Sequence, residues 1–378
     1  METFVTITRA IEIARQHPLE YSTETISLEQ AHNRILSEDI QSKVDDPPFD
    51  NSAMDGWAVR SGDNKRVEVG TTAAGDPPSQ IGEGEAIRIM TGAPIPTGAD
   101  SIVMVEDGID GRAHTNFIRK RGENLTKGMT IIEAGQIMTP ATISLAATMG
   151  YPTIPVRVKP RVAVLSTGNE LVSPGEELNE GQIYESNSYG IYSLLKKIGC
   201  DPIQYDVVDD TIEGLRKTLD SIDCDVIITS GGVSMGEFDY VRKLMEEEGT
   251  IHFWKVAMRP GGPPLFGTWN GTPLFGLPGN PVSSHLVFLM LVAPWLSPET
   301  PLMNQVRVRM KDAVKGAPNK VCFRRIVITT EGDQLVASTH THQGSGNIHS
   351  LVAHNGVTSL PPDTGANVGD IIDALWFL

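Results

Sequence analysis

Strands and helices alternate between Arg161 and Leu296, and this pattern constrains the fold more than any other feature of the chain. Runs such as RVAVLS and DVIITS are typical of buried strands, and mostly apolar or amphipathic helical segments separate them. Strands that alternate with helices form a parallel, doubly wound sheet. We therefore expect a central α/β domain over residues 158–300, with ligands at the carboxyl ends of its strands.

The regions that flank this domain have a different character. Residues 45–123 hold short β-like runs between Gly, Pro, Asp and Asn clusters, which predicts a small β domain. Helical patterns precede and follow it, so residues 1–44 and 124–157 are predicted to form one elongated, segmented domain with the β domain inserted. Residues 301–378 return to strand patterns and predict a C-terminal β domain. The fold class is therefore a multidomain protein of α/β and β domains.

Three successive strands of the α/β region end in loops rich in glycines, hydroxyls and carboxylates. These loops contain STGNE at 166–170, Asp209-Asp210, and the segment 230–239. Such loops on one sheet edge suit a phosphate held by backbone N–H groups and a Mg²⁺ held by carboxylates. The candidate metal ligands are Glu170, Asp209 and Asp239. The candidate phosphate-binding residues of the third loop are Ser230, Gly231, Gly232 and Ser234. Solvated loop carboxylates are the alternative interpretation.

Two later segments favour anions. Lys255 and Arg259 are the last charged residues before an uncharged stretch that reaches Pro298, and they flank a Gly/Pro loop. Cations beside such a loop indicate an anion site. The turn GLPGNP, with Pro278 and Pro281, opens an apolar helix whose N-terminus also favours anions.

Three segments of the inserted region could carry chemistry. Asp55 follows a turn-rich loop and could bind a cation or orient a substrate, while Thr91 follows a strand and could face an oxyanion. Arg119 begins a run of three cations that could receive a phosphate. Each has a plain alternative: an Asx turn, a Gly/Pro turn and a solvated charged loop.

Composition excludes several classes of function. A net charge of −16 disfavours nucleic acid and anionic membrane as partners. Three cysteines without a CxxC pair fit a reducing compartment. The N-terminal segment lacks a signal-peptide pattern, and the apolar run 286–296 is too short to span a bilayer, so we expect a cytoplasmic protein. Neither a P-loop nor a strand-linked GxGxxG is present, which argues against kinases and dinucleotide dehydrogenases.

Taken in order, the motifs resemble the MoeA/gephyrin family. The matching strings run from residue 49 to 345: FDNSAMDGWAVR, RIMTGAPIPTGAD, RKRGEN, STGNEL, DDT, SGGVSMGEFDYV, FWKVAMRPG, GLPGNPVSS and HQGS. The resemblance implies four domains, including an α/β domain related to molybdopterin adenylyltransferases and a C-terminal β-barrel-like domain. It also implies a homodimer, whose active cleft lies between the α/β domain of one subunit and the inserted domain of the other.

The resemblance further implies a molybdopterin molybdenumtransferase reaction. Molybdate would be inserted into adenylyl-molybdopterin with release of AMP, and Mg²⁺ would be the cofactor. Molybdopterin adenylyltransferase and molybdoenzyme maturation proteins are the further partners that it implies. The family's functional residues fall on Asp55, Thr91, Arg119, Glu170, Asp209, Asp239, Lys255, Arg259, Pro278 and Pro281.

By this resemblance the functional residues divide into three groups. The carboxylates of the α/β domain would hold Mg²⁺ and the adenylate phosphate. Lys255 and Arg259 would hold molybdate or the pterin phosphate. Asp55, Thr91 and Arg119 would act across the dimer cleft.

Three positions depart from the family pattern. Gly262 stands where many relatives carry a lysine, Asn124 where the family has an acid, and Asn169 where Asp is frequent. One anion contact is therefore missing or supplied elsewhere, and the preference between molybdate and tungstate stays open. An adenylyltransferase and a non-catalytic scaffold are the alternatives. The extra domains argue against the first, and the lack of a fused adenylyltransferase domain argues against the second.

Overall fold

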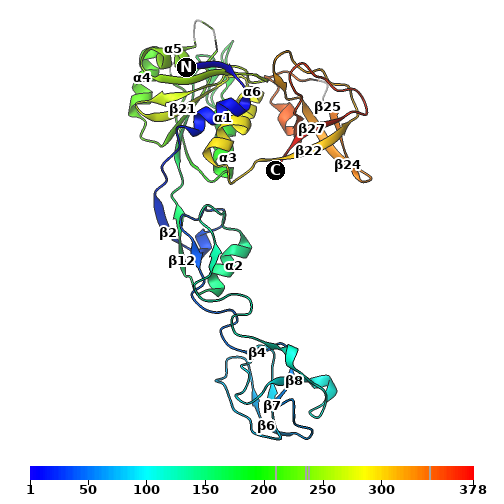
Figure 1. Ribbon diagram of the computed structural model, residues 1–378. Coiled ribbons are helices and arrows are strands. Elements are labelled where there is room, and N and C mark those ends of the chain that lie inside the picture. The colour runs from blue at the N-terminus through cyan, green and yellow to red at the C-terminus, as the bar shows by residue number, and fades with distance from the viewer. Residues whose placement is uncertain (209–210, 235, 237–238, 340–341) are drawn as a thin grey trace. The chain divides into compact units, whose positions relative to one another are not determined.

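Two units make up the chain, and each is described by itself (Figure 1). The first combines residues 1–22 and 158–378, and the second spans residues 23–157. The computed structural model describes all residues except 209–210, 235, 237–238 and 340–341. Among the described helices, none is long and apolar enough to cross a membrane.

A seven-stranded sheet forms the centre of the first unit, in the order β1-β18-β20-β21-β17-β13-β16. Its strands are β1 (Glu2–Val5), β13 (Arg161–Ser166), β16 (Asp201–Gln204), β17 (Val226–Ser230), β18 (Thr250–Val256), β20 (Leu265–Trp269) and β21 (Thr272–Leu277). Only β20 among these strands runs antiparallel to its neighbours. The predicted doubly wound α/β fold is confirmed.

The N-terminal residues join this sheet. β1 pairs in parallel with β18, and α1 (Ile7–Arg15) buries Ala10, Ile13 and Ala14 in the core of the α/β domain. The sequence pattern assigned residues 1–44 to the segmented domain. In the structure, residues 1–22 instead group with the α/β domain, because β1 pairs with β18 and becomes the edge strand of its sheet.

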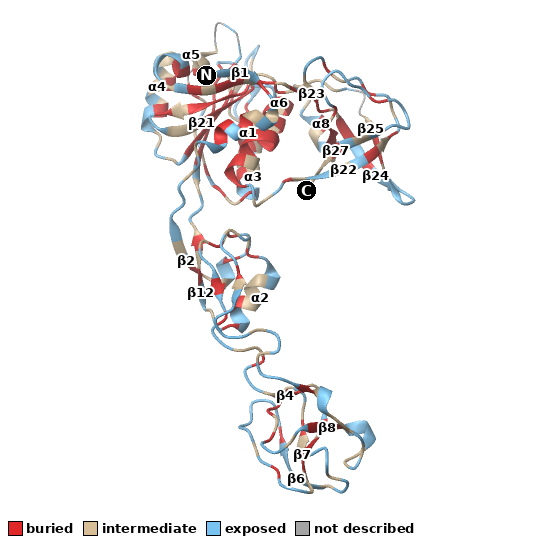
Figure 2. Ribbon diagram, viewed as in Figure 1, coloured by how far each residue is buried: buried red, intermediate tan, exposed pale blue. Residues whose placement is uncertain are grey.

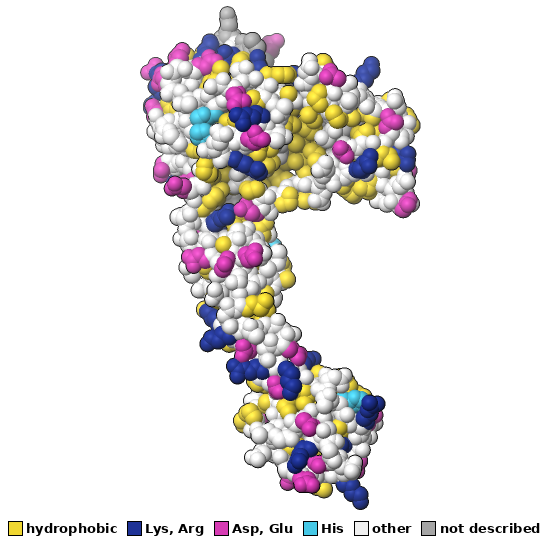
Figure 3. Space-filling model, in the orientation of Figure 1, with side chains coloured by type: hydrophobic (Ala, Val, Ile, Leu, Met, Phe, Trp, Pro, Cys, Tyr) yellow, Lys and Arg dark blue, Asp and Glu magenta, His cyan; other side chains and the backbone are white. Residues whose placement is uncertain are grey.

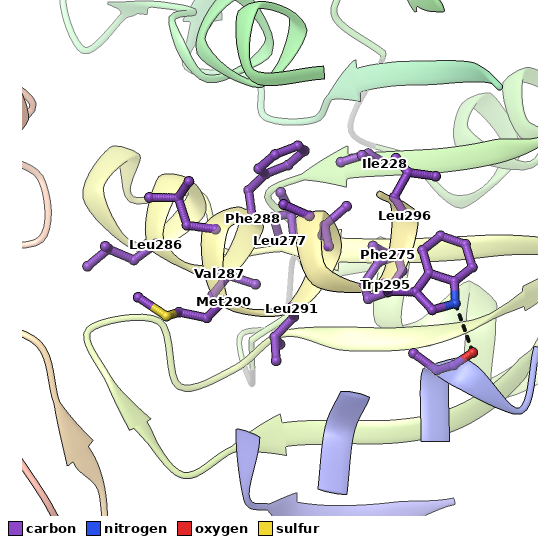
Figure 4. Packing of buried hydrophobic residues seen from close by; sticks show 14 of the residues in the cluster. Ile228, Phe275, Leu277, Leu286, Val287, Phe288, Met290, Leu291, Trp295 and Leu296 are labelled. Carbon is purple, nitrogen blue, oxygen red and sulfur yellow. Dashed lines mark hydrogen bonds between the residues drawn. The ribbon is translucent and has the colours of Figure 1, made fainter. Parts of the chain in front are cut away.

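Helices cover both faces of the sheet. They are α3 (Asn187–Lys197), α4 (Ile212–Ser221), α5 (Tyr240–Glu247), α6 (Pro281–Val287), the π-helical turn Phe288–Val292 and α7 (Ala293–Leu296). The predicted apolar helix corresponds to the continuous helical stretch from α6 to α7. Most residues of this stretch are buried, as are most residues of the central strands of the sheet (Figure 2). Trp295 packs against Phe275, and its indole N–H donates to the carbonyl of Ala14 at 2.9 Å (Figure 4).

The C-terminal region is a β domain, as the sequence pattern predicted, and it forms a closed barrel, as the family resemblance implied. Its strands are β22 (Met303–Met310), β24 (Arg325–Glu331), β25 (Gln334–Thr339), β26 (Gly356–Thr358) and β27 (Ile371–Phe377). The short strand β23 (Val321–Cys322) pairs in parallel with β19 (Met258–Arg259) of the α/β domain. This pairing joins the barrel to residues 255–263 of the α/β domain, which we call the basic loop because Lys255 and Arg259 belong to it.

The second unit contains a β insertion. Its sheet is β6-β7-β5-β8-β9: Val67–Thr72, Glu85–Ile89, Gly56–Val59, Ser101–Met104 and Ala113–His114. Strands on either side of this insertion pair with each other: β2 (Thr23–Ser27) with β12 (Thr153–Arg157), and β3 (Ile40–Gln41) with β11 (Thr130–Ile132). The helix predicted near Pro140 is α2 (Pro140–Thr148).

Candidate active site

A cavity of about 590 Å³ opens at the carboxyl ends of β13, β17 and β21. Loops that follow these three strands line it, together with the start of α3 and Gly346 of the C-terminal domain. The parallel strands end on one edge, so loops distant in sequence meet there. The predicted site residues that line the cavity are Glu170, Ser230, Gly231, Gly232, Asp239 and Pro281.

Other predicted residues lie outside this lining. Pro278 is buried in the turn before the cavity, and Ser234 is exposed beyond it. Asp209 lies outside the described residues. Among the residues that are described, no three His, Cys, Asp or Glu side chains gather as a metal-ligand cluster. The described lining therefore offers Glu170 and Asp239 as the predicted metal ligands.

Carboxylates give the cavity its electrostatic character. Glu170, Glu185 and Asp239 line it, and the described lining contains no lysine or arginine. Asp239 precedes α5, and its carboxylate accepts a hydrogen bond from the N–H of Gly236. Such a lining favours a hard cation, and Mg²⁺ is commonly held by one or two carboxylates together with substrate phosphates. The donor chemistry therefore fits the implied metal.

The glycines of the third loop allow it to approach the first loop closely. Gly231 has φ +98°, and a Cβ there would lie 2.7 Å from the carbonyl oxygen of Thr167. Its N–H donates to the carbonyl of Leu277 at 3.0 Å. The backbone N–H of Gly231, which the sequence predicted to bind a phosphate, is therefore already hydrogen-bonded to β21.

Two residues at the start of α3 were missed by the sequence interpretation. The side-chain amide of Asn187 donates to Ser230 Oγ at 2.8 Å and to the carbonyl of Gly279 at 2.7 Å, which joins two strand-end loops. Glu185 is buried and accepts from Ser166 Oγ at 2.9 Å and from Ser188 N–H at 2.8 Å. The polar string YESN before an apolar helix was the available signal, because such residues cluster at helix starts.

Thr167 holds a hydroxyl that the folded chain leaves unpaired. Its Oγ1 is buried and has no hydrogen-bond partner in the described part of the chain. A buried hydroxyl without a partner costs free energy, so replacing it with an isosteric methyl is expected to stabilise the protein.

Thr167→Val should therefore raise the free energy of unfolding by about 1–2 kcal/mol in urea denaturation. Thr358→Val is the matched control, since Thr358 is also buried but its hydroxyl donates to the carbonyl of Cys322 at 3.0 Å. That variant should lose stability. A loss of stability in Thr167→Val would show that its hydroxyl is bonded in the folded protein.

The basic loop lies on the same edge of the sheet but outside the cavity lining. β18 and β21 run in the same direction, and β20 and β21 separate β18 from β17. Lys255, near the end of β18, places its ammonium 4.0 Å from the centre of the Trp254 ring. Arg259 is exposed on β19. The two predicted cations therefore sit beside the carboxylate loops rather than among them.

The lysine expected near Gly262 has a counterpart from elsewhere in the chain. A Cβ built on Gly262 would lie 3.6 Å from the ammonium nitrogen of Lys320, which belongs to the C-terminal domain. Of the two alternatives drawn from the sequence, a cation supplied by another segment is the one that this geometry favours. No motif connects the two positions, so sequence reasoning missed Lys320.

In the second unit, Asp55 and Thr91 are brought together. The backbone N–H and the hydroxyl of Thr91 both donate to Asp55 Oδ1 at 2.7 Å. These hydrogen bonds hold the pKa of Asp55 below its usual value, and the bond from the Thr91 backbone contributes most. This exposed carboxylate is therefore ionised at neutral pH.

Carboxylates neutralise part of the run of three cations at residues 119–121 in the second unit. Lys120 bonds to Asp50 at 2.8 Å and Arg121 bonds to Asp45 at 2.6 Å, whereas Arg119 is exposed on β10 (Ile118–Arg119). The amide of Asn124 donates to Asp46 Oδ2 at 3.1 Å. An ionised acid at position 124 could not donate this bond and would repel Asp46, which gives a physical reason for that departure.

Three family models match successive parts of the chain and together cover most of it. Residues 5–150 match the MoeA N-terminal region (domain I and II), residues 163–298 match the probable molybdopterin binding domain, and residues 307–377 match the MoeA C-terminal region (domain IV).

Individual relatives share these regions. A molybdopterin molybdenumtransferase 2 of Mycobacterium tuberculosis is 36% identical over 373 residues, covering 90% of this chain and 91% of its own. A molybdopterin molybdenumtransferase of Haemophilus influenzae is 38% identical, covering 76% and 75%. The crystal structure of a molybdopterin biosynthesis MoeA protein from Pyrococcus horikoshii OT3 is 28% identical, with a TM-score of 0.83 over 99% of this chain and 100% of that one.

Proposed function

The chain belongs to the MoeA family, and from this premise we propose that it is a molybdopterin molybdenumtransferase that inserts molybdate into adenylyl-molybdopterin, releases AMP and yields the molybdenum cofactor. The observation that carries the proposal is the cavity at the sheet edge, where carboxylates and small polar groups meet. Such a lining suits an adenylate phosphate that arrives with a divalent cation.

We assign the metal-binding role to Glu170 and Asp239, together with Asp209. The first two contribute carboxylates to the cavity lining. Bound Mg²⁺ would offset negative charge on the phosphate that leaves with AMP. Ser230 supplies a hydroxyl beside the phosphate, and Asn187 keeps that hydroxyl in place by its 2.8 Å hydrogen bond.

Lys255 and Arg259 are proposed to hold the second anion, which is molybdate or the phosphate of the pterin. Lys255 lies near the end of β18, at the sheet edge that carries the cavity, and Arg259 follows it on β19, where it is exposed. Cations that lie outside the acidic lining can attract an anion that Glu170 and Asp239 would repel. Separate regions of opposite charge would keep the metal and the oxyanion apart before reaction.

We further propose a homodimer in which Asp55, Thr91 and Arg119 of one subunit face the cavity of the other. Hydrophobic side chains gather on the surface where the α/β domain meets the C-terminal barrel (Figure 3), and a contiguous apolar surface supports a protein contact. We propose that the reaction takes place in the cytoplasm. Molybdopterin adenylyltransferase is the proposed source of substrate, and molybdoenzyme maturation proteins are the proposed recipients of the product.

Reconstitution with purified protein tests the reaction. With adenylyl-molybdopterin, molybdate and Mg²⁺, we expect one AMP to be released for each molybdenum inserted. Chelation of Mg²⁺ with EDTA should lower the rate at least about a hundredfold, because removing charge stabilisation at a transferring phosphate has effects of this size, and added Mg²⁺ should restore it. AMP release is measured by chromatography and inserted molybdenum by mass spectrometry.

The same assay separates the alternatives. Protein incubated with molybdopterin and Mg-ATP should form no adenylyl-molybdopterin, and its accumulation without metal insertion would identify an adenylyltransferase. A dimer that is inactive under all of these conditions would favour a scaffold. Running molybdate and tungstate in parallel determines the preferred oxyanion.

A further inference from the structure

A second cavity, of about 260 Å³, lies at the carboxyl ends of β13 and β16. Its walls come from the end of β13, the loop after β14 (Leu171–Val172), the start of α3 and residues 204–207. Among the described residues, Glu185 alone lines both this cavity and the larger one. The two cavities are therefore neighbours with separate walls, and the described lining of the second contains none of the residues assigned above to metal or anion binding.

Glu185 is a buried carboxylate whose partners are neutral. Its Oε1 accepts the hydroxyl of Ser166 at 2.9 Å and the N–H of Ser188 at 2.8 Å, and its Oε2 accepts the hydroxyl of Ser188 at 2.6 Å. In the part of the chain that the structure describes, no lysine or arginine forms an ion pair with it. A carboxylate can accept about four hydrogen bonds, so Oε2 has room for one more donor.

Gln204 is oriented by the same network. The hydroxyl hydrogen of Ser188 is donated to Glu185, so Ser188 can only accept from the side-chain N–H of Gln204, at 2.7 Å. The amide oxygen of Gln204 must then point away from Ser188, and within the described ranges nothing donates to it. This oxygen is a second acceptor at the wall of the cavity.

Asp206 adds an exposed carboxylate to the same wall. The N–H groups of Tyr205 and Val208 donate to carbonyls of β13 at 2.9 and 3.0 Å, so the backbone on both sides of Asp206 is held against the sheet. No described residue forms a hydrogen bond or an ion pair with the Asp206 carboxylate. The described lining has no lysine or arginine, so Asp206 and the amide oxygen of Gln204 favour a ligand with N–H donors.

We propose that the second cavity binds the heterocycle of the pterin, with its 2-amino and N3–H groups donating to the acceptors of this wall and its ring lying against Tyr189. The inference rests on the proposed function, in which adenylyl-molybdopterin is the substrate. Tyr189 lines the cavity and is 47% exposed, so its ring is available to stack on a flat ligand. Because Glu185 belongs to both linings, a pterin here would lie next to the cavity proposed for the adenylate phosphate.

The order of donors and acceptors distinguishes the pterin from the adenine of the same substrate. A pterin carries two adjacent donors, the 2-amino group and N3–H, which match the acceptors of the wall. Adenine places the acceptor N1 beside its amino group, and that nitrogen would face a carboxylate oxygen with no hydrogen between them. The wall at Gln204 and Asp206 therefore favours the pterin.

Binding of free heterocycles tests the inference without turnover. The probes are AMP, neopterin, which is a soluble pterin, and the lumazine counterpart of neopterin, in which an oxygen replaces the 2-amino group. Each is titrated against the full-length protein and its variants by equilibrium dialysis. Asp206→Asn removes the exposed carboxylate, and Tyr189→Ala removes the ring. Glu177→Gln is the control, because Glu177 is exposed between β14 and β15 (Ile183–Tyr184) and lines neither cavity.

The wild type should bind neopterin about tenfold more tightly than the lumazine, as expected for a hydrogen bond to a charged group. Asp206→Asn should weaken neopterin binding about tenfold, abolish most of this preference and leave AMP binding unchanged. Tyr189→Ala should weaken the binding of neopterin and the lumazine equally, since stacking does not depend on the 2-amino group. Glu177→Gln should match the wild type.

Several results would overturn the inference. They are equal affinities of the wild type for neopterin and the lumazine, no binding of neopterin at millimolar concentration, and a preference that survives in Asp206→Asn. Weaker AMP binding in Asp206→Asn without weaker neopterin binding would assign the cavity to adenine instead. Failure of the proposed function has a different signature: neopterin binds as described, but the reconstituted protein neither releases AMP nor inserts molybdenum.

Discussion

Replacing Asp239 with asparagine is expected to lower the rate of molybdenum insertion by at least about a hundredfold, which is the usual size of losing one charge-stabilising group in an active site. Asp239 lines the cavity, and its carboxylate accepts the N–H of Gly236. The amide has nearly the same shape, so the fold should persist. It lacks the negative charge that a bound Mg²⁺ requires, and it has only one acceptor oxygen.

The reason for the loss can be separated from a change in folding. Asp239→Asn should need a higher Mg²⁺ concentration for its residual rate, and its urea midpoint should stay near that of the wild type. Asp333→Asn is the matched control, because Asp333 is exposed in the turn between β24 and β25 and should keep full activity. Wild-type turnover by Asp239→Asn would remove Asp239 from the proposed metal site.

The position of the cavity could be predicted from the sequence because ligands of a parallel sheet bind at the carboxyl ends of its strands. Loops after β13 and β17 are distant in sequence, yet both strands must end on one edge of the sheet. Their Gly, Ser, Asp and Glu residues therefore converge without any knowledge of contacts. The buried strands and the apolar helix could also be predicted from the sequence, because their hydrophobic patterns are long and continuous.

Contacts between segments without a shared pattern could not be predicted. Lys320 reaches Gly262 only because β23 pairs with β19, and strands of two residues leave no periodic signal. The bond between Asp55 and Thr91 likewise depends on the packing of the inserted sheet. Asn187 has the composition of a helix start, but its bonds to two other loops depend on tertiary structure.

The N-terminal strand illustrates the same limit. Residues 2–5 have no pattern that separates an edge strand of the α/β sheet from a segment of a neighbouring domain. Their partner, β18, lies roughly 250 residues away, and pairing with it makes β1 the edge strand of the sheet. Domain boundaries that depend on such a pairing become visible only in the structure.

Gly231→Ala is expected to lower the free energy of unfolding by about 2–4 kcal/mol, because two costs add at this residue. Its φ of +98° disfavours any side chain, and the new methyl would lie 2.7 Å from the carbonyl oxygen of Thr167. Backbone cannot yield as a flexible side chain can, so the first and third cavity loops must separate. Insertion activity should fall with stability, since the cavity lies between those loops.

Gly271→Ala isolates the first of the two costs. Gly271 has φ +87° in the turn between β20 and β21, and a Cβ there would meet no atom within 4 Å. This control should therefore lose only about 1 kcal/mol, the cost of a side chain at positive φ, and should keep its activity. Urea denaturation of both variants measures the difference, which reports the contact with Thr167. Equal losses in the two variants would mean that the first and third cavity loops are not in close contact at Gly231 and Thr167.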